Sequence, residues 1–194
     1  MFTLDRRQSW ALAAALAALM GLTRSHHFAT LNFLPDASWA VFFLAGFLFS
    51  RLGVLLVLLA VAGLADALAL GLGGVADFCV SIAYPFLVPA YGALWFGGRW
   101  LAKQGRSDWR LLPRAAWAVV LAALACESIS SGSFYFLSGV VAAPSLAGFG
   151  ATLELYFPRS LANFTIYLAL AAPPLAGLIW AQNQRAEVRS ARVS

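Results

Sequence analysis

The chain has 194 residues, of which 62% are hydrophobic and only 11% are charged, and its formal net charge at pH 7 is +5. Because soluble domains carry roughly 25% charged residues, this composition excludes an ordinary soluble protein and predicts an integral membrane protein. The positive charge does not indicate nucleic-acid binding, since the basic residues lie in short loops between apolar runs. In such loops they orient a protein in the bilayer.

At about 20 residues per span, the length allows six membrane-spanning helices and no separate soluble domain. We therefore predict an all-α fold in which residues 1–194 form a single membrane domain. The first apolar run looks like a signal peptide, but Ala-x-Ala occurs only inside the run, so we interpret it as a retained first span. The predicted spans are 8–22, 37–50, 52–70, 77–96, 115–131 and 161–180.

The first predicted span is rich in alanine, and Ala13 and Ala17 stand four residues apart. Small residues at this spacing let two helix backbones approach closely, which makes this face a candidate for docking a partner. The same alanines would also serve simply to fill a tightly packed bundle.

Two stretches between the spans are unusually rich in polar and aromatic residues. One is 23–36, before the second span, and the other is 130–160, before the sixth. The second stretch is too apolar for a solvated loop, so we expect it to fold back over the bundle. Together the two stretches supply the candidates His26, His27, Asn32, Phe33, Tyr135, Glu154, Tyr156 and Arg159.

The third predicted span, 52–70, contains a carboxylate, Asp66, in its outer third. Glu127 lies at a similar depth in the fifth span. Charges at membrane depth are costly and usually face a partner or a cavity. A structural ion pair is one interpretation. Since no lysine or arginine is predicted at that depth, an outward-open polar cavity is the favoured one.

The stretch 71–100 combines a glycine-rich turn, Asp77, the thiol Cys79 and the aromatic Tyr84. Asp77 can cap a helix and so place Cys79 on its first turn. A helix N-terminus favours the thiolate, which is the nucleophilic and metal-binding form, whereas the charge of Asp77 opposes it. Alternatively, Cys79 is a small buried hydrophobe, as most free cysteines are.

Of the 13 lysines and arginines, all except Arg24 and Arg159 fall on one side of the predicted membrane. Cytoplasmic loops are enriched in these residues, so we predict that both termini are cytoplasmic. This orientation gathers the polar candidates on the outer side. Carboxylates, tyrosines and amides there suit an amide-rich solute, and a thiolate beside imidazoles suits a soft or borderline transition metal.

Two segments, SHHFATLNFLPD (25–36) and ADFCVSIAYPFLVPAYGALWFGGRW (76–100), resemble the BtuM family of small solitary cobalamin importers. The short spans, the small-residue face of the first span and the outward pocket resemble S-components of energy-coupling-factor vitamin transporters. The resemblance covers nearly the whole chain. It implies a multi-pass protein of the cell inner membrane, surrounded by lipid, that binds base-off cobalamin (vitamin B12) in an outward-facing pocket.

The resemblance also implies that Cys79 ligates the cobalt and supports reductive removal of cyanide from cyanocobalamin. Cobalamin is then the transported ligand, and no other cofactor is expected. Ala13 and Ala17 match the docking face for a coupling module only loosely, so dependence on such a partner stays open. The implied substrate-binding residues are Cys79, Asp66, Tyr84, His27, His26, Asn32, Phe33, Tyr135, Glu154, Tyr156 and Arg159.

Two other functions stay open at this point. The chain can be an S-component for a smaller vitamin, or a membrane thiol enzyme that uses Cys79 and Cys126 as a redox pair. The second is disfavoured because the two thiols share no local motif.

Overall fold

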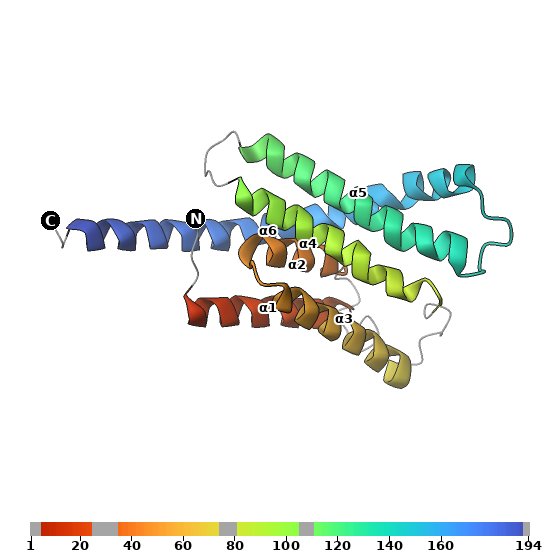
Figure 1. Ribbon diagram of the computed structural model, residues 1–194, viewed down its shortest axis with the longest axis horizontal. Coiled ribbons are helices and arrows are strands. Elements are labelled where there is room, and N and C mark those ends of the chain that lie inside the picture. The colour runs from red at the N-terminus through yellow and green to blue at the C-terminus, as the bar shows by residue number, and fades with distance from the viewer. Residues whose placement is uncertain (1–4, 25–34, 74–80, 105–110, 192–194) are drawn as a thin grey trace.

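A computed structural model describes residues 5–24, 35–73, 81–104 and 111–191. This part of the chain is all-α and contains no strand (Figure 1). Successive helices run in opposite directions along the bundle. The elements are α1 (Arg6–Arg24), α2 (Ser38–Leu48), α3 (Leu52–Gly73), the 3-10 helix η2 (Tyr84–Phe86), α4 (Leu87–Lys103), α5 (Leu111–Leu137) and α6 (Leu146–Ala191).

Three helices in the described ranges are long and apolar enough to cross a membrane: Leu52–Gly71, Leu111–Leu137 and Leu146–Leu178. Only 11% of the most apolar window of the first of these is buried inside the bundle. Apolar residues on the outside of a helix need a hydrocarbon environment rather than water. The chain is therefore a membrane protein by length and composition, and six spans stay a prediction.

The helices extend beyond several predicted spans. Most of the stretch 130–160 is helical, because α5 continues to Leu137 and α6 already begins at Leu146. Gly139 has a φ of 75°, and this left-handed conformation, which glycine adopts without steric cost, ends α5. The apolar residues before this turn belong to α5, and those from Leu146 onward belong to α6. Three prolines lie within α6.

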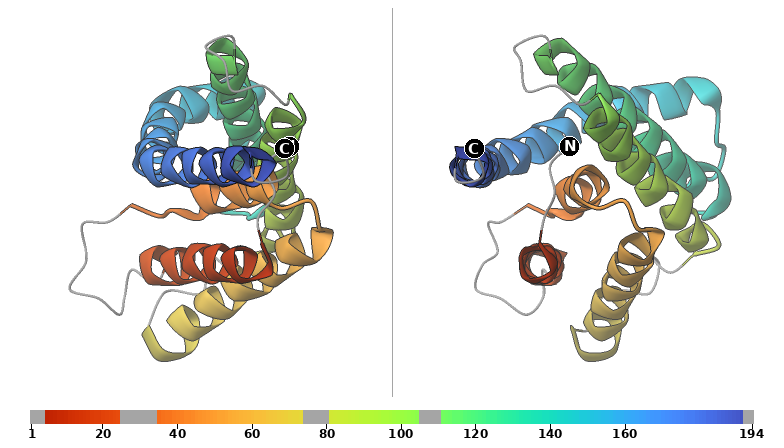
Figure 2. Two further views of the ribbon diagram at one scale, coloured as in Figure 1. Left: turned by 90° about the vertical axis from the view of Figure 1, so that its left-hand side faces the viewer. Right: turned by 60° about the vertical axis from the view of Figure 1, so that its left-hand side comes forward.

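The central helix of the bundle is α2, with α1, α3, α4 and α6 around it (Figure 2). It is short and almost wholly buried from Ser38 to Gly46. Phe42 of α2 stacks on Tyr91 of α4, with 4.4 Å between ring centroids and 9° between ring planes. The core of the molecule thus lies around α2.

Glycines allow α2 and α4 to pack backbone against backbone. A methyl group on Gly46 would overlap the carbonyl of Trp95, and a methyl group on Gly98 would overlap the carbonyl of Phe43. Each clash involves main-chain atoms of the facing helix, which a side-chain rotation cannot relieve.

Gly98→Ala is therefore expected to destabilise the protein by about 1–3 kcal/mol, the usual cost of overpacking a core. Gly92→Ala in the same helix is the matched control, because a methyl group there has no neighbour within 4 Å. Thermal unfolding of the purified protein in detergent measures both. Equal melting temperatures for the two variants would show that α2 and α4 are not in this close contact.

Candidate functional site

A buried ion pair joins the end of α1 to α3. Arg24 is the last residue of α1, and its Nε and Nη2 atoms donate to the two carboxylate oxygens of Asp66 at 2.6 and 2.7 Å. The side chain of Arg24 is 11% exposed and that of Asp66 is 22% exposed. Two parallel hydrogen bonds between a guanidinium and a carboxylate are among the strongest polar contacts in proteins, and they also fix the orientation of both groups.

Hydroxyl groups from three other elements complete this cluster. The Tyr84 hydroxyl donates to Oδ2 of Asp66 at 2.9 Å. The Nη1 atom of Arg24 donates to the Tyr91 hydroxyl at 2.6 Å and to the Ser38 hydroxyl at 3.0 Å. The guanidinium also lies 5.5 Å from the centroid of the Tyr91 ring. Arg24 thereby holds together groups from α2, α3 and α4.

The beginning of α2 adds a second carboxylate. Asp36 accepts hydrogen bonds from the backbone N–H of Ser38 at 3.0 Å and from its hydroxyl at 2.7 Å. Its other oxygen lies 3.7 Å from Nη1 of Arg24. A carboxylate at this position accepts a hydrogen bond from an N–H group of the first helical turn. Its negative charge also interacts favourably with the positive end of the helix dipole. We call Arg24, Asp36, Ser38, Asp66, Tyr84 and Tyr91 the Arg24 network.

The residues on either side of the undescribed stretch 25–34 are held in place by further hydrogen bonds. The backbone N–H of Ala37 donates to the Thr23 hydroxyl at 3.1 Å, which joins α2 to α1. The Tyr167 hydroxyl of α6 donates to the carbonyl of Pro35 at 2.6 Å. The connection between α1 and α2 therefore leaves from, and returns to, a rigid part of the bundle.

The expectation that no basic residue lies at the depth of Asp66 is wrong. The prediction assigned Arg24 to the polar stretch 23–36, outside the first span. In the structure α1 continues to Arg24, and the long side chain reaches Asp66 on α3. The prediction placed each residue in the membrane by the position of its backbone. The guanidinium of an arginine lies several ångströms from its own Cα atom, so Arg24 reaches deeper than its backbone does.

The predicted site residues fall into three groups. Asp66 and Tyr84 are brought together within the Arg24 network. Tyr135 lies elsewhere, packed against Phe136 and Phe149, with 5.0 and 5.7 Å between ring centroids. Glu154, Tyr156 and Arg159 are exposed on α6. The remaining site predictions, Cys79, His26, His27, Asn32 and Phe33, lie outside the described residues.

The predicted docking residues lie on α1, away from the Arg24 network. Ala13 lines a groove between α1 and α3, and Ala17 packs against the core. Both residues are partly buried within the bundle.

Sequence reasoning missed four members of the network, namely Arg24, Asp36, Ser38 and Tyr91. One signal was available, because Arg24 is one of only two basic residues on the predicted outer side. An isolated arginine there needs an acidic partner more than one in a basic loop does. For the other three residues, the sequence carries no long-range information about which helix faces which.

The second intramembrane carboxylate, Glu127, is buried in α5 beside Cys126, which is fully buried. The Ser131 hydroxyl, one turn later, donates to Oε1 of Glu127 at 2.7 Å. In the described ranges, no group of three or more His, Cys, Asp or Glu side chains is arranged to hold a metal ion.

Among the described residues, Arg24 and Tyr84 account for the hydrogen bonds to Asp66. A carboxylate offers about four lone-pair positions, and these two residues occupy three of those of Asp66. Comparison of the sequence with models of protein families and with curated proteins finds no match.

Removing Arg24 leaves Asp66 without its cation. Arg24→Met is expected to cost about 3–5 kcal/mol of stability, as for other buried pairs that lose one partner. Arg159→Met, which removes the exposed arginine of α6, should change stability by less than about 0.5 kcal/mol. Thermal unfolding of both variants in detergent is the measurement. Equal melting temperatures for the two variants would show that the ion pair does not stabilise the fold.

Proposed function

We propose that the protein takes up cobalamin across the inner membrane, and that Cys79 is the axial ligand of the cobalt in bound base-off cobalamin. The observation that carries the proposal is the convergence of the Arg24 network at one end of the bundle. Chain segments with the candidate ligands adjoin this network in the sequence. Arg24 directly precedes the stretch with His26 and His27, and Tyr84 follows Cys79 by five residues.

The chemistry of the network supports a ligand with many amide groups. Cobalamin has a corrin ring whose rim carries amide side chains, and a carboxylate such as that of Asp66 accepts hydrogen bonds from amide N–H groups. The hydroxyls of Tyr84 and Tyr91 both donate and accept. A thiolate is a softer ligand than a carboxylate and therefore suits a transition metal such as cobalt.

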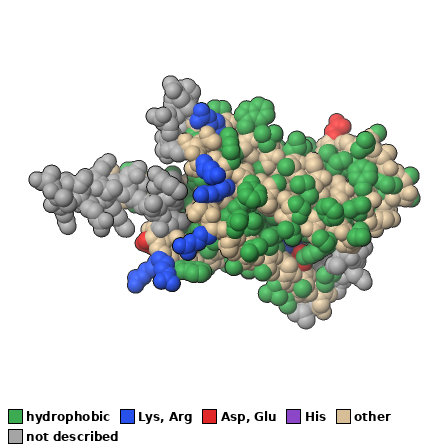
Figure 3. Space-filling view, viewed as in Figure 1, with side chains coloured by type: hydrophobic (Ala, Val, Ile, Leu, Met, Phe, Trp, Pro, Cys, Tyr) green, Lys and Arg blue, Asp and Glu red, His purple; other side chains and the backbone are tan. Residues whose placement is uncertain are grey.

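The location of the network supports uptake from the outer side. Lysine and arginine side chains gather at the opposite end of the bundle, where α1 and α3 begin and α4 ends (Figure 3). We call this the basic end. Because basic residues face the cytoplasm in most membrane proteins, the Arg24 network faces outward.

Decyanation is the reductive part of this proposal. Oxidation of two molecules of an external thiol to one disulfide releases two protons and supplies two electrons, which convert two cobalt(III) centres to cobalt(II). One cyanide leaves each cobalt with its electron pair. Cys79 takes part as a cobalt ligand in this scheme, so its sulfur remains bound and is not consumed.

The cobalt ligand is tested by the visible absorption spectrum of cyanocobalamin bound to the purified protein. Wild type is expected to change the spectrum, and Cys79→Ala is expected to lose that change while retaining weaker binding through ring and amide contacts. Cys126→Ala is the matched control, because Cys126 is fully buried in α5 and should leave the spectrum as in wild type. A wild-type spectrum from Cys79→Ala would rule out this ligand.

The choice of vitamin is tested by thermal stabilisation, since a ligand that binds the folded state raises the melting temperature. Cobalamin is expected to stabilise the protein, and biotin and thiamine are not. The opposite pattern would favour an S-component for a smaller vitamin. The redox-pair alternative instead requires a disulfide between Cys79 and Cys126, which non-reducing peptide mapping would detect.

Uptake itself is tested by growth of a cobalamin-dependent strain that lacks its own importer. Expression of this protein is expected to restore growth at low cobalamin, whereas Cys79→Ala should restore it poorly. Repeating the experiment with and without a coupling module decides whether the protein acts alone. No rescue in either background would contradict the proposal.

A further inference from the structure

A groove of about 840 Å³ lies between α1 and the beginning of α3, at the basic end. It is far along α1 from the Arg24 network, which is at the other end of that helix. Its size is within the range of about 300–1,000 Å³ that is usual for ligand pockets. The groove is lined by Arg6, Ser9, Trp10, Ala13, Phe49, Arg51, Gly53, Val54 and Val57.

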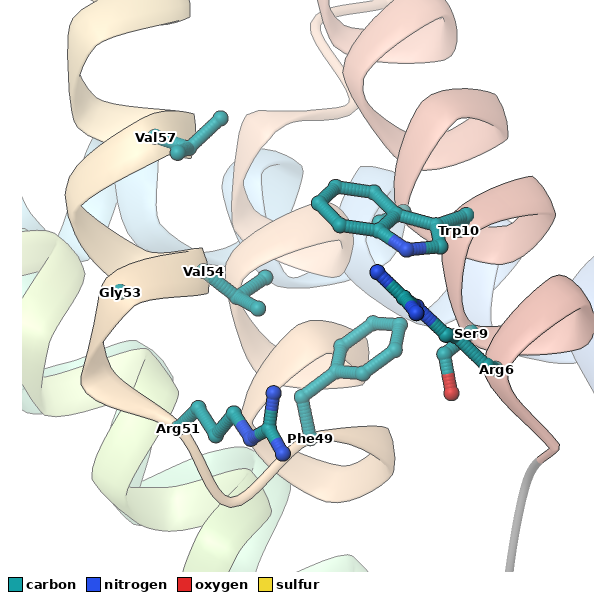
Figure 4. Close-up of a pocket in the computed structure, with 9 residues that line it drawn as sticks. Arg6, Ser9, Trp10, Phe49, Arg51, Gly53, Val54 and Val57 are labelled. Atoms are coloured by element: carbon teal, nitrogen blue, oxygen red, sulfur yellow. The ribbon is translucent and has the colours of Figure 1, made fainter.

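Two arginines mark the charged part of the groove. Arg6 and Arg51 lie on opposite sides, with the Phe49 ring between them (Figure 4). Both are exposed, and neither forms an ion pair with a residue in the described ranges. None of the described residues that line the groove is acidic. The groove thus offers two cationic groups that have no carboxylate partner among the described residues.

The nearest acidic residue in the sequence, Asp5, already has a structural role. Its carboxylate accepts a hydrogen bond from the backbone N–H of Gln8 at 2.7 Å, and the Gln8 side chain accepts one from the backbone N–H of Asp5 at 3.2 Å. This reciprocal pair is a capping box that begins α1. It fixes the position of Arg6 on the first helical turn.

The other part of the groove is apolar. Val54 and Val57 project from α3 on one side, and Trp10 projects from α1 on the other (Figure 4). Trp10 and Val57 are 69% and 60% exposed. A site with guanidinium groups at one end and exposed apolar side chains beyond them is amphipathic.

Tryptophans indicate how deep the groove lies in the membrane. Trp10, Trp100 and Trp117 are exposed, and each lies within four residues of an arginine at the basic end. Exposed tryptophan is enriched where headgroups meet hydrocarbon. The two arginines therefore lie at headgroup level, and the valines lie beside the acyl chains.

We propose that this groove binds an anionic phospholipid of the leaflet at the basic end. Arg6 and Arg51 bind the phosphate, and an acyl chain lies along Trp10, Val54 and Val57. Charge complementarity favours this occupant, because basic pockets between membrane helices on the cytoplasmic side bind anionic headgroups. A soluble anion would leave the apolar side chains uncovered, and a zwitterionic lipid would not match the charge.

The test uses delipidated protein in a neutral detergent, melted with added phosphatidylglycerol or phosphatidylcholine. Inorganic phosphate and glycerophosphoglycerol, the headgroup without acyl chains, form two further arms. Phosphatidylglycerol alone is expected to raise the melting temperature of wild type. In Arg6→Gln/Arg51→Gln, half of the maximal shift should require about thirtyfold more lipid, because each arginine near an anionic surface contributes roughly a factor of five.

The control variant is Arg99→Gln/Arg114→Gln, which removes the same charge from the basic end outside the groove and should respond as wild type. Ser9→Glu, which adds a carboxylate to the groove, should weaken the lipid effect, whereas Ser9→Ala should not. Equal loss in both double variants would indicate a diffuse basic surface and overturn the proposal. So would stabilisation by phosphatidylcholine or by phosphate alone.

A protein occupant is distinguished by co-purification. The proposal is overturned if no lipid stabilises the protein and Arg6→Gln/Arg51→Gln instead abolishes co-purification of a coupling module. That result would assign the groove to a protein partner. The lipid proposal does not rest on cobalamin as the substrate, so the spectral test of Cys79 can fail while this one succeeds.

Discussion

The bidentate pair of Arg24 and Asp66 is the interaction on which the end of the bundle opposite the basic end depends. An unpaired buried charge is costly, so the loss of either residue is expected to destabilise the fold. The remaining donors of Arg24 are used on Ser38 and Tyr91, and the Tyr84 hydroxyl adds to Asp66. One cation thus determines how four elements meet, and it makes their arrangement specific in a bundle held otherwise by apolar contacts.

Away from this network, the bundle is held by close packing of its helices. The short helix α2 is buried on nearly all sides, and Gly46 and Gly98 bring its backbone against that of α4. Phe42 and Tyr91 link the apolar core to the Arg24 network. The ring of Tyr91 stacks on Phe42 in the core, and its hydroxyl accepts a hydrogen bond from Arg24. Packing of α2 on α4 therefore positions a member of the polar network.

The two ends of the bundle differ in chemistry in a way that separates the two proposed sites. At the end that carries the Arg24 network, the charges of Arg24 and Asp66 are paired within the bundle. At the basic end, arginines are exposed and unpaired among the described residues, and tryptophans lie beside them. A neutral solute would be recognised at the first end by hydrogen bonds, and an anionic lipid at the second by charge.

The sequence by itself determined the membrane character, the helical fold and the uneven distribution of charge, because these follow from composition and from the order of apolar runs. It also identified Asp66 and Tyr84, since polar groups within apolar runs are conspicuous whatever their partners. Tertiary structure alone decided that Arg24 pairs with Asp66, 42 residues away in the sequence. It also decided that most of 130–160 is helical and that Tyr167 of α6 holds the beginning of α2. Such pairings depend on how far each helix continues and on which faces meet, and neither is encoded in the residues near the contact.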